Sequence, residues 1–232
     1  MHYLVNNKNK IIFGWSEKCG CSHVKNLFYF FQTNNTKNEI HKGKDCQRLP
    51  KNIDDYTIIL FIRNPYKRLV SGFLDKYKEG GQYRNRWNHS TITFAKFVDD
   101  LISDNWKMVE KSHFIQQTRE RFDVNIITKA KCFKIYDIEH IDYTYIEELY
   151  GTKIPQEVLN FKGEHIRNKF APDYNDNDNV YDLDMKIYFQ YNVPLKKFYN
   201  ETIKNKIYNF FQKDFLFFKE HGFDYENNTI FS

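Results

Sequence analysis

The sequence lacks long hydrophobic runs, and cysteine is scarce. No apolar stretch approaches the roughly 20 residues that a membrane-spanning helix needs, and the start of the chain has no hydrophobic region of a signal peptide. Of the 232 residues only 4 are cysteines, and two of them, Cys19 and Cys21, lie too close in sequence to pair with good disulfide geometry. We therefore expect a soluble, cytoplasmic protein in which all four cysteines are reduced thiols.

The sequence also lacks a long block of one charge. The formal net charge is +5, and the basic residues are interspersed with acidic ones. A nucleic-acid-binding face would need a denser basic stripe, so this balance favours anionic ligands over nucleic acid. The hydrophobic fraction of 41%, which includes 22 Phe and 17 Tyr, is enough for a buried core. Since no internal repeat or interdomain linker is visible, we predict a single domain over residues 1–232.

Residues 11–31 predict a strand, a tight loop and a helix. The strand is the apolar run at 11–13, and the helix carries an apolar stripe at i, i+3, i+4 and i+7 from Val24 to Phe31. Gly20 gives the loop between them backbone freedom, and Lys18 adds a mobile cation. Backbone N–H groups at the start of such a helix form an anion site. An ordinary turn with a solvated lysine is the alternative.

Residues 56–71 predict a second anion site. The run at 56–62 is almost entirely apolar and β-branched, which is typical of a central strand covered on both faces. It ends at Arg63, where open α/β sheets bind their ligands, and a guanidinium suits a phosphate. Pro65 fits the first position of the next helix, which carries the hydroxyl of Ser71. A surface salt bridge at a helix start is the alternative role for Arg63.

The rest of the chain alternates between short strands and helices. The predicted elements are strands at 124–127 and 132–136, helices at 93–103, 138–150 and 182–190, a helical turn at 155–160, and one last helix from about residue 200 to Gly222. Residues 32–55, 80–90 and 162–178 are predicted to be connections or loops. This alternation predicts a three-layer α/β/α fold with a mainly parallel central sheet.

The two anion sites together resemble those of the sulfotransferases that use 3′-phosphoadenylyl sulfate (PAPS), most closely the carbohydrate, Golgi-type branch. The first loop of that family is P-K-x-[AG]-[CS]-[ST]; this chain has E-K-C-G-C-S, which matches at Lys18, Gly20, Cys21 and Ser22. Glu17 stands where the family has proline, and its charge should weaken anion binding unless the side chain points away. The resemblance implies a P-loop-like α/β fold and a sulfuryl transfer that requires no metal.

The second stretch matches the family's 3′-phosphate motif, R-[DHN]-P-[FY]-x-R-L-[VL]-S-[AG]-[FY], at every specified position, as R-N-P-Y-K-R-L-V-S-G-F. This match implies that Arg63 and Ser71 bind the 3′-phosphate of the donor. Weaker similarities are H-F-I-Q-Q at 113–117, which resembles the family's H-[WF]-x-x-Q segment, and the closing segment at 207–225.

The resemblance also implies the roles of the remaining donor-binding residues. Lys18 would stabilise the bridging oxygen of the donor, where charge develops during transfer. Backbone N–H groups of the loop and the Ser22 hydroxyl would hold the 5′-phosphate, and Arg167 would close over the donor. The implied donor-binding residues are Lys18, Cys19, Gly20, Cys21, Ser22, His23, Arg63, Ser71 and Arg167.

The general base must accept a proton near neutral pH, and His113 is the first candidate because imidazole titrates in that range. Glu110, Glu79 and His89 are the alternatives, and His113 could instead bind the acceptor or be structural. The basic, aromatic loop at 80–90 could contact the acceptor or simply be solvated.

Other function classes remain open. A kinase-like P-loop phosphotransferase would need G-x-x-x-x-G-K-[ST], whereas here Lys18 precedes Gly20. A metal-binding module would use Cys19, Cys21 and His23, with Cys46 or Cys132 as the fourth ligand. The Cys-x-Cys spacing is closer than the usual zinc spacing. A non-enzymatic adaptor would not need the reactive side chains. For the acceptor, the resemblance implies a carbohydrate hydroxyl, with protein tyrosine or a small alcohol as alternatives. The sequence does not predict the oligomeric state.

Overall fold

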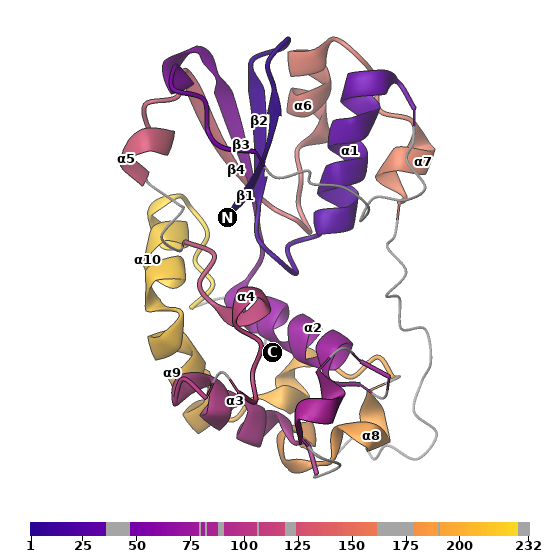
Figure 1. Cartoon of the computed structure of the whole chain (residues 1–232), viewed down its shortest axis with the longest axis vertical. Coiled ribbons are helices and arrows are strands. Elements are labelled where there is room, and N and C mark those ends of the chain that lie inside the picture. The colour runs from indigo at the N-terminus through magenta and orange to yellow at the C-terminus, as the bar shows by residue number, and fades with distance from the viewer. Residues whose placement is uncertain are drawn as a thin grey trace. The chain divides into compact units, whose positions relative to one another are not determined.

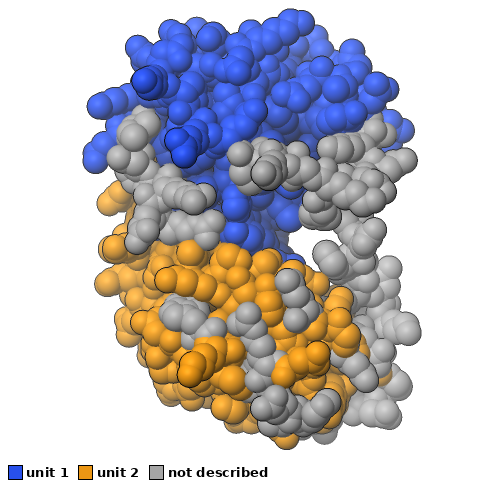
Figure 2. Space-filling view, in the orientation of Figure 1, with its two compact units in different colours: residues 1–63, 117–164 blue, residues 64–116, 165–232 orange. Residues whose placement is uncertain are grey.

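The computed structural model describes residues 1–35, 47–78, 80–81, 83–87, 91–105, 107–118, 124–161, 179–189 and 191–226. The chain divides into two compact units (Figure 2). Unit 1 comprises Met1–Arg63 and Gln117–Glu164, and unit 2 comprises Asn64–Gln116 and His165–Ser232. The expectation of a single domain over the whole chain stays a prediction.

Unit 1 is built on a four-stranded sheet in the order β1-β2-β3-β4. The strands are β1 (His2–Asn6), β2 (Ile11–Trp15), β3 (Thr57–Ile62) and β4 (Cys132–Asp137). β1 pairs antiparallel with β2, while β2, β3 and β4 pair in parallel. The predicted α/β class with a mainly parallel sheet is therefore confirmed. Because parallel strands run in one direction, the carboxyl ends of β2, β3 and β4 meet at the same edge of the sheet.

Helices pack on one side of this sheet (Figure 1), namely α1 (Cys21–Thr33), α6 (Tyr143–Tyr150) and α7 (Gln156–Leu159), and a 3-10 turn, η1 (Ile53–Asp55), precedes β3. Phe13 of β2 is central to the core between them. Its ring centroid lies 5.1 Å from that of Phe61 on β3 and 5.5 Å from that of Phe28 on α1. Each fully buried side chain of this size contributes about 1.5–3 kcal/mol, so the cluster fixes α1 against the strand that precedes it.

Unit 2 is helical in its described part. Its elements are α2 (Pro65–Lys76), η2 (Arg84–Trp87), α3 (Phe94–Ile102), α4 (Lys111–Phe114), η3 (Val180–Asp182), α8 (Met185–Tyr188), η4 (Leu195–Phe198), α9 (Glu201–Phe210) and α10 (Gln212–Glu220). Phe97 joins them in an aromatic core, because its ring centroid lies 4.9 Å from that of Phe73 and 4.9 Å from that of Phe114. All three rings are fully buried. Much of the aromatic content of the chain therefore builds a core.

Two predicted elements are wrong. Residues 124–127, predicted as a strand, form the short helix α5 (Val124–Ile127). Periodicity cannot distinguish a strand from a helical turn over four residues. The predicted single last helix is two helices, α9 and α10, because Phe211 between them leaves the helical conformation (φ −100°, ψ 20°). The apolar spacing continues across Phe211, so the sequence pattern did not reveal the break.

β1 was not predicted from the sequence. Tyr3, Leu4 and Val5 are buried, and a turn that ends at Lys10, with φ 56°, returns the chain into β2. A short apolar run followed by several Asn and Lys and a second apolar run is the signal of a hairpin. The contacts between β1 and the loop after β2 could therefore not be predicted either.

The other predicted elements within the described residues are confirmed, with shifted ends. The helix predicted at 138–150 begins at Tyr143, because Asp142 accepts the Tyr145 backbone N–H at 3.2 Å and caps it. The loop predicted at 162–178 lies outside the described residues. None of the helices in the described part of the chain has the length and hydrophobicity of a membrane span.

Thr93 tests the capping of α3, because its Oγ1 accepts the Lys96 backbone N–H at 3.1 Å. Thr93→Ala is expected to lower the free energy of unfolding by about 1 kcal/mol, since it leaves that N–H without its side-chain partner. Thr91, which is exposed, offers a matched control, and Thr91→Ala should change stability by less than about 0.5 kcal/mol. Urea unfolding followed by circular dichroism measures both; equal effects would contradict the role of the cap.

Candidate functional site

A tight turn joins β2 to α1 at the carboxyl edge of the sheet. The Cys19 N–H donates to the Ser16 carbonyl oxygen at 3.1 Å, and Lys18 and Gly20 both have left-handed backbone, with φ 65° and 66°. For a residue with a Cβ this conformation costs roughly 1–2 kcal/mol, so other contacts must hold Lys18 in place. At position 20 a Cβ would overlap the side chain of Ile138, so both the backbone angle and the space require glycine.

α1 begins directly after this turn, with Cys21, Ser22 and His23 in its first turn. Gly20 is the N-cap and makes no side-chain hydrogen bond to the helix. The first backbone N–H groups of a helix have no acceptor within the helix itself, and the helix dipole adds partial positive charge at the same end. The start of α1 is therefore suited to an anion.

His23 contacts α6 from the first turn of α1. Its Nε2 lies 2.8 Å from the Tyr143 hydroxyl, and the two rings meet edge to face. Burial lowers the pKa of His23, and a hydrogen bond with the backbone of Phe161 opposes this only in part. A neutral imidazole adds no positive charge to the anion site, so the contacts favour a supporting role for His23.

Arg63 lies at the end of β3, next to the turn that carries Lys18. Its Nη1 donates to the Lys18 carbonyl oxygen at 3.3 Å, and its Nη2 lies 3.6 Å from Glu139 Oε1. Its Nε is buried and has no hydrogen-bond partner among the residues that the structure describes. The structure thus places the Arg63 guanidinium against the backbone of the turn that carries Lys18, although the sequence assigned the two residues to separate anion sites.

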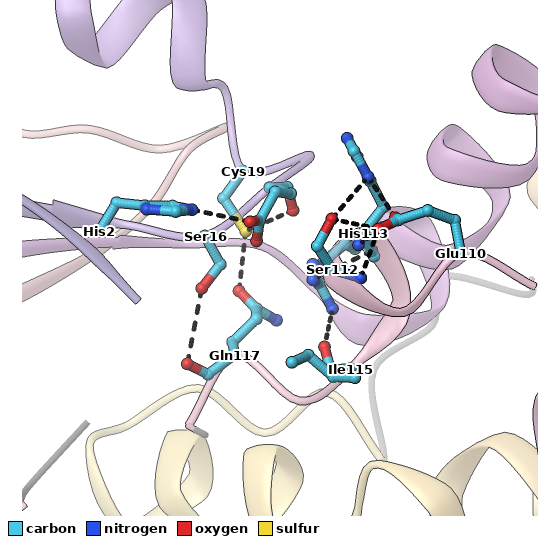
Figure 3. A network of polar contacts seen from close by, with 10 residues as sticks. His2, Ser16, Cys19, Glu110, Ser112, His113, Ile115 and Gln117 are labelled. Atoms are coloured by element: carbon cyan, nitrogen blue, oxygen red, sulfur yellow. Dashed lines mark hydrogen bonds and ion pairs between the residues drawn. The ribbon is translucent and has the colours of Figure 1, made fainter. Parts of the chain in front are cut away.

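Gln117 contacts both the turn after β2 and the end of β3. Its Oε1 accepts the Arg63 backbone N–H at 3.1 Å, and its Nε2 donates to the Arg63 carbonyl oxygen at 2.8 Å. The same Oε1 accepts the Cys19 thiol at 2.9 Å (Figure 3). The Gln117 side chain is fully buried. In the sequence, Gln117 is only the last residue of the H-F-I-Q-Q segment, and no local pattern indicates its contacts.

Glu17, where the resembled family has proline, contacts β1. Its Oε1 lies 2.7 Å from Nε2 of His2, and both side chains are largely buried. The contact gives the Glu17 carboxylate a hydrogen-bond partner on β1, the strand that was not predicted from the sequence.

In unit 2, Glu110 holds His113. The Glu110 carboxylate accepts the backbone N–H groups of Ser112 at 2.8 Å and His113 at 2.9 Å, and thus caps α4. Its Oε2 also lies 2.5 Å from Nδ1 of His113 (Figure 3). Burial raises the pKa of Glu110, but the hydrogen bonds from His113 and Ser112 outweigh it and lower the pKa to about 2. Such a carboxyl group is a weak base near pH 7, so the geometry favours His113 over Glu110.

Arg68 supports the same segment of unit 2. It is almost fully buried, and its Nη1 and Nη2 donate to the carbonyl oxygens of Ile115 at 2.8 Å and His113 at 3.2 Å. Ser71 lies one turn further along α2 and is half-buried. Lys18 and Arg63 therefore meet within unit 1, whereas Ser71 and His113 belong to unit 2.

Several predicted residues lie outside the described part of the chain, namely Glu79, His89, Arg167 and Cys46. Cys19, Cys21 and Cys132 are free cysteines. Within the described residues, no group of at least three His, Cys, Asp or Glu side chains is arranged to hold a metal ion.

Comparison with known proteins gives two findings. A family model described as "Sulfotransferase family" matches residues 1–223 and so extends over both units. The human (Homo sapiens) protein carbohydrate sulfotransferase 9 is 30% identical over 93 residues. That alignment covers 34% of this chain and 21% of the human protein, so the match spans about one fifth of the relative's length. No solved structure gives a significant match.

The lowered pKa of Glu110 predicts that the contribution of this residue to stability depends on pH. Its pKa is lowered from 4.5 to about 2 in the folded protein, so its contribution is fully present above pH 4.5 and is lost as the pH falls toward 2. Glu110→Gln should cost about 1 kcal/mol at pH 7, and less at pH 3. Urea unfolding at both pH values measures the difference, with exposed Glu220→Gln as the matched control. A cost that does not change with pH would contradict the assignment.

Proposed function

The chain belongs to the sulfotransferase family, and we propose that it transfers a sulfuryl group from PAPS to a hydroxyl group of an acceptor. One observation carries the proposal: the guanidinium of Arg63 donates to the carbonyl oxygen of Lys18 at 3.3 Å. PAPS carries its 3′-phosphate and its 5′-phosphosulfate on the same ribose, so its binding needs two anion-binding sites close together. The turn after β2 and the end of β3 supply such a pair.

The residues of unit 1 fit a phosphate-containing donor. The buried Nε of Arg63 has no hydrogen-bond partner among the described residues and could donate to a phosphate oxygen. The ion pair of Arg63 with Glu139 is long, at 3.6 Å, and both side chains are partly exposed. Pairs of this kind contribute little, so a phosphate can compete for the guanidinium. The N-terminus of α1 and the left-handed turn before it suit the other phosphate.

We assign the donor-binding roles accordingly. Arg63 and Ser71 bind the 3′-phosphate, and the backbone N–H groups of Cys19–His23 bind the phosphosulfate together with the Ser22 hydroxyl. Arg167 completes the donor site in this proposal. Gly20 is required because a side chain at that position would collide with Ile138 and disrupt the turn.

Lys18 stabilises the leaving group. During transfer, the bond between sulfur and the bridging oxygen breaks while the acceptor oxygen bonds to sulfur, and negative charge develops on the phosphate that leaves. A cation placed at that oxygen lowers the barrier, because it interacts more strongly with the transition state than with the ground state. The left-handed backbone of Lys18, held by Arg63 through the Lys18 carbonyl, fixes where this side chain starts.

His113 takes the proton of the acceptor hydroxyl. Its Nδ1 is hydrogen bonded to Glu110, which leaves Nε2 on the opposite side of the ring as the nitrogen that accepts the proton. The carboxylate of Glu110 then stabilises the imidazolium that forms. Arg68 holds the backbone carbonyl of His113 and thus positions the residue from its other end.

The acceptor in this proposal is a carbohydrate hydroxyl. Its support is the motif resemblance and the similarity to carbohydrate sulfotransferase 9. A screen of polysaccharides, tyrosine peptides and small alcohols with radiolabelled PAPS decides among the acceptor classes, and labelling confined to the peptides or alcohols would reject the carbohydrate.

Lys18→Met tests the role of the lysine in the transfer step. This variant keeps the length of the side chain and the backbone carbonyl that Arg63 contacts, but it removes the charge. We expect kcat to fall by about 100-fold or more, with a smaller change in the affinity for the product PAP. Steady-state assays with radiolabelled PAPS measure kcat, and Lys8→Met, in the exposed turn after β1, is the matched control. Activity like that of the wild type would reject the assignment.

Donor identity is tested by calorimetry with PAP and with ATP plus Mg²⁺. PAP is expected to bind the wild type, and Arg63→Lys should weaken PAP binding by about tenfold, because it replaces a multidentate guanidinium with a single ammonium. Arg48→Lys, at an exposed position of unit 1, should leave PAP binding unchanged. Binding of ATP without binding of PAP would reject the proposal in favour of a kinase-like phosphotransferase.

A further inference from the structure

We propose that Gln117 is a positioning residue for the donor, and that its side-chain amide sets the spacing between the Lys18 turn and Arg63. This inference rests on the proposed function, because the spacing matters only for a ligand that engages both segments. Gln117 does not touch the donor in this proposal. It acts through the two segments that do.

The contacts of Gln117 explain why the position of Arg63 depends on it. The parallel ladder of the sheet ends near Ile62, whose carbonyl oxygen accepts the Ile138 N–H at 2.9 Å. One residue later, the peptide groups of Arg63 bond to the Gln117 side chain instead, with its N–H bound at 3.1 Å and its carbonyl oxygen at 2.8 Å. A primary amide can accept and donate at once, so Gln117 continues the strand pairing for one residue beyond the sheet.

The same amide also holds the turn after β2. The Oε1 atom that accepts the Arg63 N–H accepts the Cys19 thiol at 2.9 Å, and Cys19 lies between Lys18 and Gly20. The Ser16 hydroxyl lies 3.5 Å from the Gln117 carbonyl oxygen (Figure 3). One buried residue therefore contacts both ends of the turn and the end of β3.

The chemistry of these contacts requires glutamine. A methionine would fill a similar volume but could neither accept from Arg63 and Cys19 nor donate to Arg63. A glutamate would lose the donor and place a charge in a fully buried position. An asparagine would be one methylene too short to keep the same reach. Because buried polar groups that lose their partner are costly, the Arg63 backbone would move to find new partners if the amide were removed.

The affinity for a ligand with two phosphates depends on the spacing between the Lys18 turn and Arg63. PAP can engage both sites only if they lie at the right separation, and the benefit of the second phosphate depends on that geometry. Adenosine 5′-phosphate (AMP) has no 3′-phosphate and does not engage the second site. The ratio of the AMP dissociation constant to the PAP dissociation constant therefore measures how well the two sites are spaced, independently of a uniform loss of folded protein.

The test compares Gln117→Met with Gln116→Met. Gln116 is the neighbouring glutamine, and its Nε2 donates to the Phe210 carbonyl oxygen at 2.8 Å within unit 2, so it is a matched control that also loses a side-chain amide. Calorimetry with AMP and PAP should show that the ratio falls by about tenfold in Gln117→Met and stays within about twofold of the wild type in Gln116→Met. Equal ratios in the wild type and Gln117→Met would overturn the inference.

Cys19→Ala provides a second variant if Gln117→Met does not fold. It removes the thiol and its contacts with Gln117 and the Glu17 carbonyl oxygen but keeps the Gln117 amide. The ratio is then expected to fall by about threefold; an unchanged ratio would overturn the inference. The two proposals fail differently. If the wild type does not bind PAP, the proposed function fails and this inference fails with it. If the wild type binds PAP and the variants keep its AMP-to-PAP ratio, the inference fails alone.

Discussion

The parallel pairing of β2 with β3 is the constraint on which the rest of unit 1 depends. It brings the carboxyl end of each strand to the same edge of the sheet, so the turn that carries Lys18 and the guanidinium of Arg63 become neighbours although 45 residues separate them in sequence. β4 extends the same edge, and Ile138, which follows it, fills the space that a side chain at Gly20 would occupy. The register of three strands thus shapes one short turn.

Much of this arrangement could be predicted from the sequence, because its signals are local. The apolar run before Arg63, the proline after it, and the apolar stripe that begins at Val24 each depend on residues within one element. The rule that ligands bind at the carboxyl ends of parallel strands then places Lys18 and Arg63 at one edge. The short helix α5 was mispredicted for the same reason: over four residues the local signal is too weak to separate strand from helix.

The supporting contacts could not be predicted, because they join residues far apart in sequence. Gln117 contacts Cys19 and Arg63 across 98 and 54 residues, and nothing in the sequence near Gln117 indicates these partners. His2 binds Glu17 only because β1 folds back on β2 as an antiparallel strand. Glu110 and His113 are closer in sequence, but their interaction depends on the capping of α4, and a helix of four residues has too weak a sequence pattern to be predicted. Each of these contacts supports a side chain that the sequence did identify.

The buried thiol of Cys19 has a consequence for how motions of this edge can be followed. The side chain is fully buried and its sulfur is hydrogen bonded to Gln117, whereas Cys21 and Cys132 are only partly buried. A thiol reagent reaches a buried, hydrogen-bonded sulfur only in conformations where its surroundings have opened. The rate at which Cys19 is alkylated under native conditions therefore reports how often the turn opens, and measuring it requires no added label.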